Sequence, residues 1–287
     1  MSDSQPLPAA TKRYSFTDLG PRVVSGLVLI ALALGTAWRG GRIFLYFWLV
    51  AAVLILWEWL TVIGARQRVL QFVVGLIGLL LAAHFALRRM PDFLFLSVLF
   101  AAGTMASLAE PRRRLWAPLG LVYATLAFLP AWVLRNSVLF GPATIYWLFA
   151  VVWGTDIMAY FGGRLIGGAK LWPQVSPSKT WAGFLTGISC GTLFGLALLA
   201  ALTDAPSPIH FLQTIGLGLL TGVVAQGGDL VESSIKRYFG VKDASRLIPG
   251  HGGVMDRLDG FIAAALLAVI VGSLRAGVAA PGIGLFR

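Results

Sequence analysis

The chain has 287 residues, of which 57% are hydrophobic and 12% charged, and its formal net charge is +11. Its mean hydropathy of +0.81 excludes an ordinary water-soluble domain and predicts a polytopic membrane protein. A positive excess of this size is also found in nucleic-acid-binding proteins, so the positions of the basic residues matter more than their sum.

Apolar segments of about 20 residues, long enough to cross a bilayer as a helix, recur along the chain with short polar breaks between them. They predict an all-α fold, a polytopic integral membrane protein with about nine transmembrane helices. The segments are 23–38, 43–63, 69–87, 93–109, 115–134, 143–161, 181–202, 211–227 and 258–280. The single cysteine, Cys190, falls within the seventh span and is interpreted as a packing residue.

Basic residues mark one side of the membrane. If the nine spans alternate in direction, 16 of the 23 Lys and Arg residues fall on the side of the N-terminus. The positive-inside rule then places the N-terminus in the cytoplasm and the C-terminus outside. The positive charge is therefore a topology signal, and we expect no nucleic-acid partner.

Acidic residues are scarcer and gather in two places. Six of the twelve lie in or beside residues 162–180 and 228–257, which we call the first and second motif loops. Two predicted spans separate the loops, so both face the same compartment. The six acids are Asp156, Asp229, Glu232, Asp243, Asp256 and Asp259.

Residues three and four positions apart share a face of a helix. This spacing places the acids on common helix faces at a similar depth in the membrane. Three such rows occur at the ends of predicted spans. They are Asp156, Tyr160 and Arg164; Asp229, Glu232 and Lys236, if the eighth span continues past Gly228; and Asp256 with Asp259. Carboxylates at water-facing helix ends, among basic residues, suit a hard cation and phosphate groups.

Glycines and basic residues flank the acids. The glycines of "GGRLIGG" and "PGHGG" would let backbone N–H groups approach phosphate oxygens closely. Positive charge comes from Lys170, Lys179, Lys236, Arg237 and Arg257. Together these features predict one joint site for phosphate groups and a metal ion.

The second motif loop resembles the signature of the phosphatidate cytidylyltransferases, also called CDP-diacylglycerol synthases. In "SSIKRYFGVKDASRLIPGHGGVMDRLDG" (233–260), S-x-x-K-R, K-D, H-G-G and D-R-x-D follow one another. The matching residues are Ser234 (with Ser233 as the alternative), Lys236, Arg237, Lys242, Asp243, His251, Gly252, Gly253, Asp256, Arg257 and Asp259. A second similar segment, 156–183, has "SPSKT" where relatives often carry S-P-K-K-T, which keeps Lys179 but removes one positive charge.

The resemblance implies a reaction of phospholipid biosynthesis. A phosphate oxygen of phosphatidic acid would attack the α-phosphorus of CTP, giving CDP-diacylglycerol and pyrophosphate. Magnesium is the implied cofactor, with a second metal ion left open. The metal ligands are assigned as Asp229 and Asp256 first, then Asp259 and Glu232.

The remaining site residues are assigned from the same resemblance. Catalytic roles go to Lys236, Arg237, Asp243, His251 and Arg257. Substrate-binding roles go to Asp156, Tyr160, Arg164, Lys170, Ser176, Lys179, Thr180, Ser234, Lys242, Gly252 and Gly253.

The chain divides into a polar cytoplasmic tail (1–21), N-terminal transmembrane helices (22–140) and a C-terminal transmembrane catalytic region with both motif loops (141–287). We expect an integral protein of the cytoplasmic or inner cell membrane, with its active site facing the cytoplasm. The expected partners are CTP, phosphatidic acid and membrane lipids, and a homodimer is left open.

Three other functions compete with this prediction. A CTP-dependent lipid kinase is disfavoured only by the signature. An ion-coupled transporter would use intramembrane acids such as Glu58 and Asp156, but five of the twelve acids of this chain lie in or beside the second motif loop. "DRLDGFIAA" begins like a CDP-alcohol phosphotransferase motif, yet that motif needs an arginine at Ala264 and further acids, and none follows Asp259.

Glu58, in "WEW", is an acid in the middle of a predicted span. A charge there costs about 2.5–3.5 kcal/mol on insertion scales, so it must face protein or water. The sequence assigns it no role.

Overall fold

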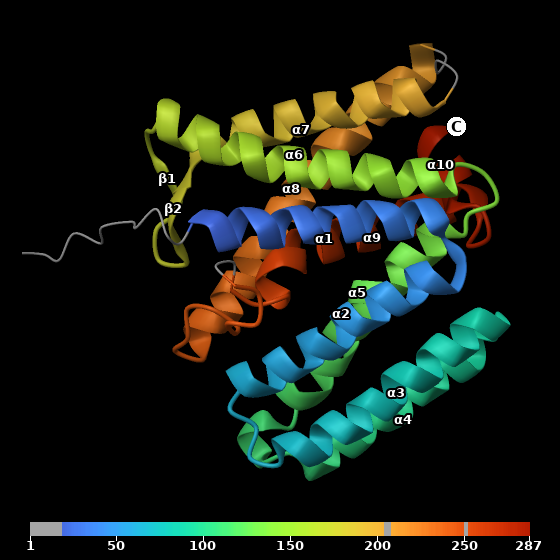
Figure 1. The fold of residues 1–287 in the computed structure, drawn as a ribbon, viewed down its shortest axis with the longest axis vertical. Helices are drawn as coiled ribbons and strands as arrows, with labels where there is room; N and C mark the ends of the chain where they lie inside the picture. Colours follow the sequence, from blue (N-terminus) through green and yellow to red (C-terminus); the bar gives the residue numbers. More distant parts are fainter. Residues whose placement is uncertain (1–18, 204–207, 250–251) are drawn as a thin grey trace, which may run out of the picture.

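The computed structural model describes residues 19–203, 208–249 and 252–287. These residues form nine long helices, two short ones and one two-stranded hairpin (Figure 1). The elements are α1 (Leu19–Arg39), α2 (Gly41–Val62), α3 (Arg68–Arg88), α4 (Pro91–Leu108), the 3-10 turn η2 (Pro111–Arg113), α5 (Trp116–Arg135), α6 (Gly141–Leu165), β1 (Lys170–Trp172), β2 (Ser176–Thr180), α7 (Trp181–Leu202), α8 (Pro208–Tyr238), α9 (Met255–Ala276) and α10 (Pro281–Phe286).

The predicted all-α fold is confirmed, and each long helix overlaps one of the predicted spans. Within the described residues, eight helices are long and apolar enough to cross a membrane. The described apolar part of α1, Val23–Arg39, is a shorter apolar helix. The structure therefore confirms a polytopic helical protein, and the predicted number of nine spans is not confirmed.

Two elements near the motif loops differ from the predicted segments. Helix α8 runs to Tyr238, well past Gly228, so Asp229 and Glu232 are helical as their spacing required. Its 31 residues span about 46 Å, against about 30 Å for a bilayer core. The first motif loop contains the antiparallel hairpin β1–β2, in which Lys170 pairs with Thr180. Strands this short give no periodic pattern, so the sequence did not predict them.

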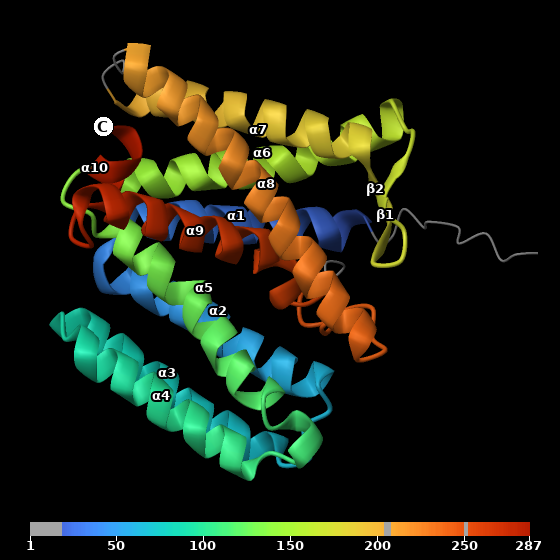
Figure 2. The same ribbon diagram turned by 180° about the vertical axis from the view of Figure 1, so that it is seen from behind.

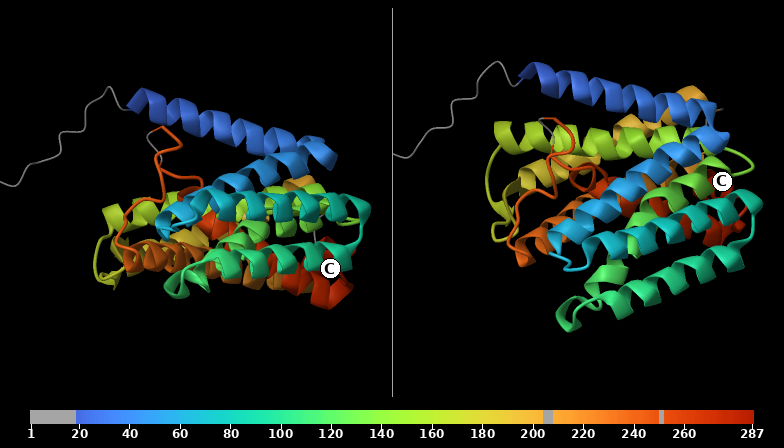
Figure 3. Two further views of the ribbon diagram at one scale, coloured as in Figure 1. Left: turned by 90° about the horizontal axis from the view of Figure 1, so that it is seen from below. Right: turned by 60° about the horizontal axis from the view of Figure 1, so that its bottom comes forward.

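The helices lie side by side, and α9 is central. The α3–α4 pair forms one edge of the molecule and α7 the opposite edge (Figures 1 and 2). Helix α8 starts beside α7 and runs diagonally across α6 and α9. Helix α1 lies along the periphery (Figure 3). A buried aromatic stack joins α2, α6 and α9: Trp48 stacks on Phe261, with ring centroids 4.6 Å apart, and Phe149 packs on both rings. This core fixes α9 relative to the N-terminal helices.

Helices α6 and α7 approach each other through glycines spaced four residues apart on α7. A Cβ added at Gly187 would lie 2.6 Å from the Thr155 carbonyl oxygen, and one at Gly191 would lie 2.3 Å from the Thr155 hydroxyl oxygen. Small residues at this spacing let membrane helices come into backbone contact. The contact sets the position of Asp156, which follows Thr155.

The two motif loops meet at one end of the helices. The β1–β2 hairpin and the connection from α8 to α9 both lie at the left end in Figure 1, while the C-terminus lies at the right end. This is the arrangement that an even number of intervening helices predicts. The predicted tail, 1–21, lies almost wholly outside the described residues.

Candidate active site

A cavity of about 700 Å³ opens between the two motif loops. Its walls come from the C-terminal half of α6, the hairpin, the start of α7, the C-terminal part of α8 and the first turn of α9. The predicted site residues that line it are Asp156, Tyr160, Arg164, Lys170, Lys179, Thr180, Asp229, Lys236, Asp243, Asp256, Arg257 and Asp259. The structure thus brings most of the predicted residues of both loops to one space.

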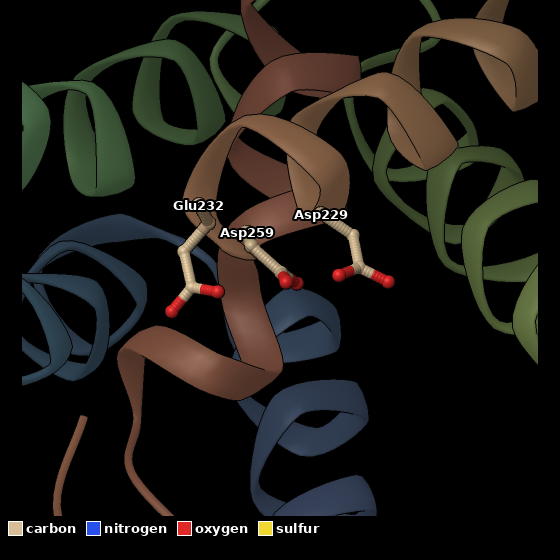
Figure 4. Close-up of side chains that lie close together, drawn as sticks. All are labelled: Asp229, Glu232 and Asp259. Atoms are coloured by element: carbon tan, nitrogen blue, oxygen red, sulfur yellow. The ribbon is translucent and has the colours of Figure 1, made fainter. Parts of the chain in front are cut away.

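Three carboxylates meet where α8 crosses α9. One oxygen from each of Asp229, Glu232 and Asp259 lies within 4.8 Å of the others, and the side chains project to the same side of the crossing (Figure 4). The close crossing depends on Gly228, where an added Cβ would lie 2.8 Å from the Asp259 carbonyl oxygen. We call these three residues the acid cluster.

The acid cluster fits a hard divalent cation. Glu232 is buried, and within the described residues its Oε1 atom receives no hydrogen bond. A buried carboxylate oxygen without a donor is costly unless a cation balances it. Mg²⁺ is usually held by one or two carboxylates, with phosphate and water oxygens as its other ligands.

Asp256 lies in a different environment from the acid cluster. Its Oδ1 atom is 2.5 Å from Lys236 Nζ, and its Oδ2 atom accepts hydrogen bonds from the Ala244 N–H (3.0 Å) and the Gly253 N–H (2.8 Å). Lys236 also pairs with Glu232 at 2.6 Å. Asp256 is not among the carboxylates that converge within 4.8 Å of one another, so the geometry ranks it behind the acid cluster. Its predicted role as a leading metal ligand stays a prediction.

A second ion pair joins the hairpin to α8. Lys179 Nζ lies 2.6 Å from Asp229 Oδ2 and 3.2 Å from Gln226 Oε1. Gln226 is buried and lines the cavity, and its Nε2 atom has no hydrogen-bond partner within the described residues. The sequence analysis did not select Gln226, whose amide oxygen helps to fix Lys179.

The α6 wall carries the row that helical spacing predicted. Asp156 and Tyr160 line the cavity, and the Arg164 guanidinium lies 5.0 Å from the centre of the Tyr160 ring. On the opposite side, Arg257 lines the cavity from the first turn of α9. Positive charge therefore faces the acid cluster from two walls.

Several predicted residues do not line the cavity. Arg237 donates to the Val241 carbonyl oxygen at 3.1 Å, and Ser234 donates to the Leu230 carbonyl oxygen of its own helix at 2.8 Å. Ser176 and Lys242 also lie outside the lining, while Ser178, which was not selected, belongs to it. Ser233 contacts Asp229 at 3.2 Å, so of the two alternatives for the first signature position it is the one directed to the acid cluster.

The glycines of the H-G-G turn act mainly on neighbouring carboxylates. Gly252 has φ +85°, a conformation that favours glycine. A Cβ at Gly252 would lie 3.0 Å from Asp256 Oδ2, and one at Gly253 would lie 2.7 Å from Glu58 Oε1. Neither lines the cavity, and the prediction for His251 falls outside the described residues. Of the glycines in the first motif loop, Gly163 lines the cavity.

The fold and the cavity define a helical membrane protein with a site suited to a metal ion and phosphate groups. The cytidylyltransferase family matches residues 20–274, most of the chain. Among curated proteins, the phosphatidate cytidylyltransferase of Brucella suis biovar 1 (strain 1330) is 37% identical over 275 residues, which are 94% of this chain and 99% of the relative.

Two further relatives carry the same name. That of Brucella abortus biovar 1 (strain 9-941) is 38% identical over 263 residues, 90% of this chain and 94% of the relative. That of Staphylococcus aureus (strain COL) is 40% identical over 144 residues, 50% of this chain and 53% of the relative. This chain belongs to the cytidylyltransferase family, and the resemblance indicated by the second motif loop is confirmed.

Proposed function

We propose that this protein is a phosphatidate cytidylyltransferase, an integral membrane nucleotidyltransferase that converts CTP and phosphatidic acid into CDP-diacylglycerol and pyrophosphate. The family and the names of its relatives support this function. The observation that carries it is the acid cluster, two of whose members, Asp229 and Asp259, line one cavity together with lysine and arginine side chains at the end of membrane helices.

The reaction requires little covalent chemistry from the protein. A phosphate oxygen of phosphatidic acid forms a bond to the α-phosphorus of CTP, and the bond from that phosphorus to the bridging oxygen breaks. Pyrophosphate leaves with the electron pair. The second pKa of a phosphate monoester is about 6, so the nucleophile is already mostly anionic at neutral pH. No general base is required, and catalysis depends on alignment and charge.

The roles of the cavity residues in alignment and charge stabilisation differ with their positions. Arg164 and Lys170 on one wall and Arg257 on the other hold negative phosphate groups of the two substrates. Lys179, fixed by Asp229 and Gln226, orients a phosphate beside the acid cluster. Lys236 is held by Glu232 and Asp256, so it keeps the first turn of α9 against α8 and stabilises charge at the cluster.

Asp229, Glu232 and Asp259 would hold the magnesium ion, and a bound ion supplies neutralisation of triphosphate charge. The distribution of basic residues supports a cytoplasmic orientation of the cavity, where CTP is available.

One assay tests the function. Purified protein in detergent, given phosphatidic acid, CTP and magnesium, should release pyrophosphate and CDP-diacylglycerol in equal amounts. Formation of CDP without pyrophosphate would instead indicate a lipid kinase. Absence of any nucleotide turnover would favour a transporter.

A further inference from the structure

Glu58 is a buried carboxylate that the proposed reaction does not use. It lies near the C-terminal end of α2 and is fully buried. Its nearest partners in space come from residues 245–255, more than 180 positions further along the chain. A buried acid among apolar helices is costly unless hydrogen-bond donors bind its carboxylate oxygens.

The donors all belong to the second motif loop and the start of α9. Glu58 Oε1 accepts from the Ser245 hydroxyl at 2.6 Å and from the Val254 N–H at 2.9 Å. Glu58 Oε2 accepts from the Met255 N–H at 2.7 Å. Val254 is the N-cap residue of α9 and Met255 its first helical residue, so Glu58 satisfies N–H groups that a helix leaves unpaired.

Gly253 makes this contact possible. A Cβ at this position would lie 2.7 Å from Glu58 Oε1 and 2.9 Å from Oε2. The Gly253 N–H meanwhile donates to Asp256 at 2.8 Å. Three consecutive N–H groups at the start of α9 are therefore bound by two carboxylates, one from α2 and one from α9 itself.

The first turn of α9 carries groups of the site. It follows directly from the residues that Glu58 binds, and it presents Asp256, Arg257 and Asp259 to the cavity. Any rotation or shift of this turn would change the distances within the acid cluster, because Asp259 belongs to α9 and the other two acids to α8.

We propose that Glu58 is a positioning residue: by binding Ser245, Val254 and Met255 it holds the first turn of α9 in the orientation that completes the acid cluster for a divalent cation. The inference rests on the proposed function for its catalytic consequence. Its structural consequence concerns the loop and the cluster alone and can be measured without substrate.

The direct test is Glu58→Gln, examined with Mn²⁺ as the probe ion. An amide keeps the shape of the side chain but replaces one acceptor by a donor, so either the Val254 or the Met255 N–H loses its acceptor. We expect amide hydrogen exchange at residues 254 and 255 to accelerate at least tenfold. The dissociation constant of Mn²⁺, measured from the electron paramagnetic resonance of the unbound ion, should rise at least fivefold, and kcat should fall at least tenfold.

Two variants test the same contacts without altering Glu58. Ser245→Ala removes one of the three donors and should give smaller changes in the same direction. Gly253→Ala pushes a methyl group into the Glu58 carboxylate and should reproduce the effects of Glu58→Gln. If Glu58→Gln does not fold, these two variants decide the inference.

Thr125→Val serves as the matched control. It removes a buried hydrogen bond within α5, in which the Thr125 hydroxyl donates to the Leu121 carbonyl oxygen at 2.8 Å. It should leave local exchange and Mn²⁺ binding unchanged. Folded Glu58→Gln with unaltered exchange and unaltered Mn²⁺ affinity would overturn the inference, as would equal effects in Thr125→Val. Failure of the wild-type protein to form CDP-diacylglycerol would refute the proposed function but would not affect the exchange and Mn²⁺ results.

Discussion

Two aspartates on the first turn of α9 show how environment separates residues of the same type. Asp256 and Asp259 share a face, as the sequence predicts, but their partners differ. Asp256 is paired with Lys236 and bound by two N–H groups. Asp259 lies beside Asp229 and Glu232, so like charges surround it. We therefore expect Asp256 to contribute to stability through Lys236 and Asp259 to act as a metal ligand.

We predict opposite stability effects for the two asparagine substitutions. Asp259→Asn removes a charge from a repulsive cluster, so the melting temperature without metal should stay or rise while turnover falls on the order of 100-fold. Asp256→Asn leaves the buried ammonium of Lys236 with one carboxylate fewer and should destabilise the protein by about 3 kcal/mol.

Thermal melting and turnover measured on the same detergent preparations check this pair. A melting temperature that falls equally in Asp259→Asn and Asp256→Asn would contradict the assignment of separate roles.

At the scale of elements, the site depends on how closely pairs of helices approach. The α6–α7 pair positions the Asp156 row and the hairpin, and it has glycines where any larger residue would separate the backbones. The α8–α9 crossing uses Gly228 in the same way. Since association of helices in a bilayer relies on packing and not on the hydrophobic effect, these contacts are sensitive to a single methyl group.

We predict that Gly191→Ala costs about 1–3 kcal/mol of stability, because its Cβ would lie 2.3 Å from the Thr155 hydroxyl oxygen and 2.6 Å from the Val151 carbonyl oxygen. Activity should fall further than the folded fraction does, since Asp156 moves with α6. Unfolding in detergent, followed with the assay of CDP-diacylglycerol, measures both effects.

Gly103→Ala in α4 is the matched control for this substitution. An added Cβ there meets no atom within 4 Å, so the change should be neutral or stabilise the helix by up to about 1 kcal/mol. Equal losses of stability in the two variants would contradict a specific effect of the α6–α7 contact.

At the scale of the whole molecule, alternating helices place both motif loops at one end (Figure 1). The predicted boundary near residue 140 coincides with the connection between α5 and α6. However, α9 packs on α2 and α5 as well as on α8, so the N-terminal helices support the site directly. The division of the chain into regions remains a prediction from sequence.

We predict that the cavity faces the cytoplasm. In a Cys190→Ala background, cysteines at Ser178 and Arg246, both exposed, should react with a membrane-impermeant maleimide in inside-out vesicles. A cysteine at Asn136, exposed at the opposite end, should react in right-side-out vesicles. Labelling of Ser178 and Arg246 from opposite sides would rule out a joint site, and labelling of both from outside would reverse the orientation.

The sequence by itself determined the class of the protein and the identity of most cavity residues. Apolar length predicted the helices because a bilayer demands about 20 such residues per crossing. Residues three or four positions apart lie on the same face of a helix, so the sequence alone placed Asp229 beside Glu232. The motif loops then indicated the family, and their residue types indicated phosphate and metal chemistry.

Only the tertiary structure decided which groups meet. It assigned Asp256 to Lys236 and Asp259 to the acid cluster, a distinction that depends on how α8 crosses α9 and not on spacing. It brought Gln226 and Ser178 into the cavity and turned Ser234 back to its own helix. It also showed that Glu58 accepts hydrogen bonds from backbone N–H groups nearly 200 residues further along the chain. A buried charge needs partners that are close in space, and a local sequence pattern does not show which distant residues these are.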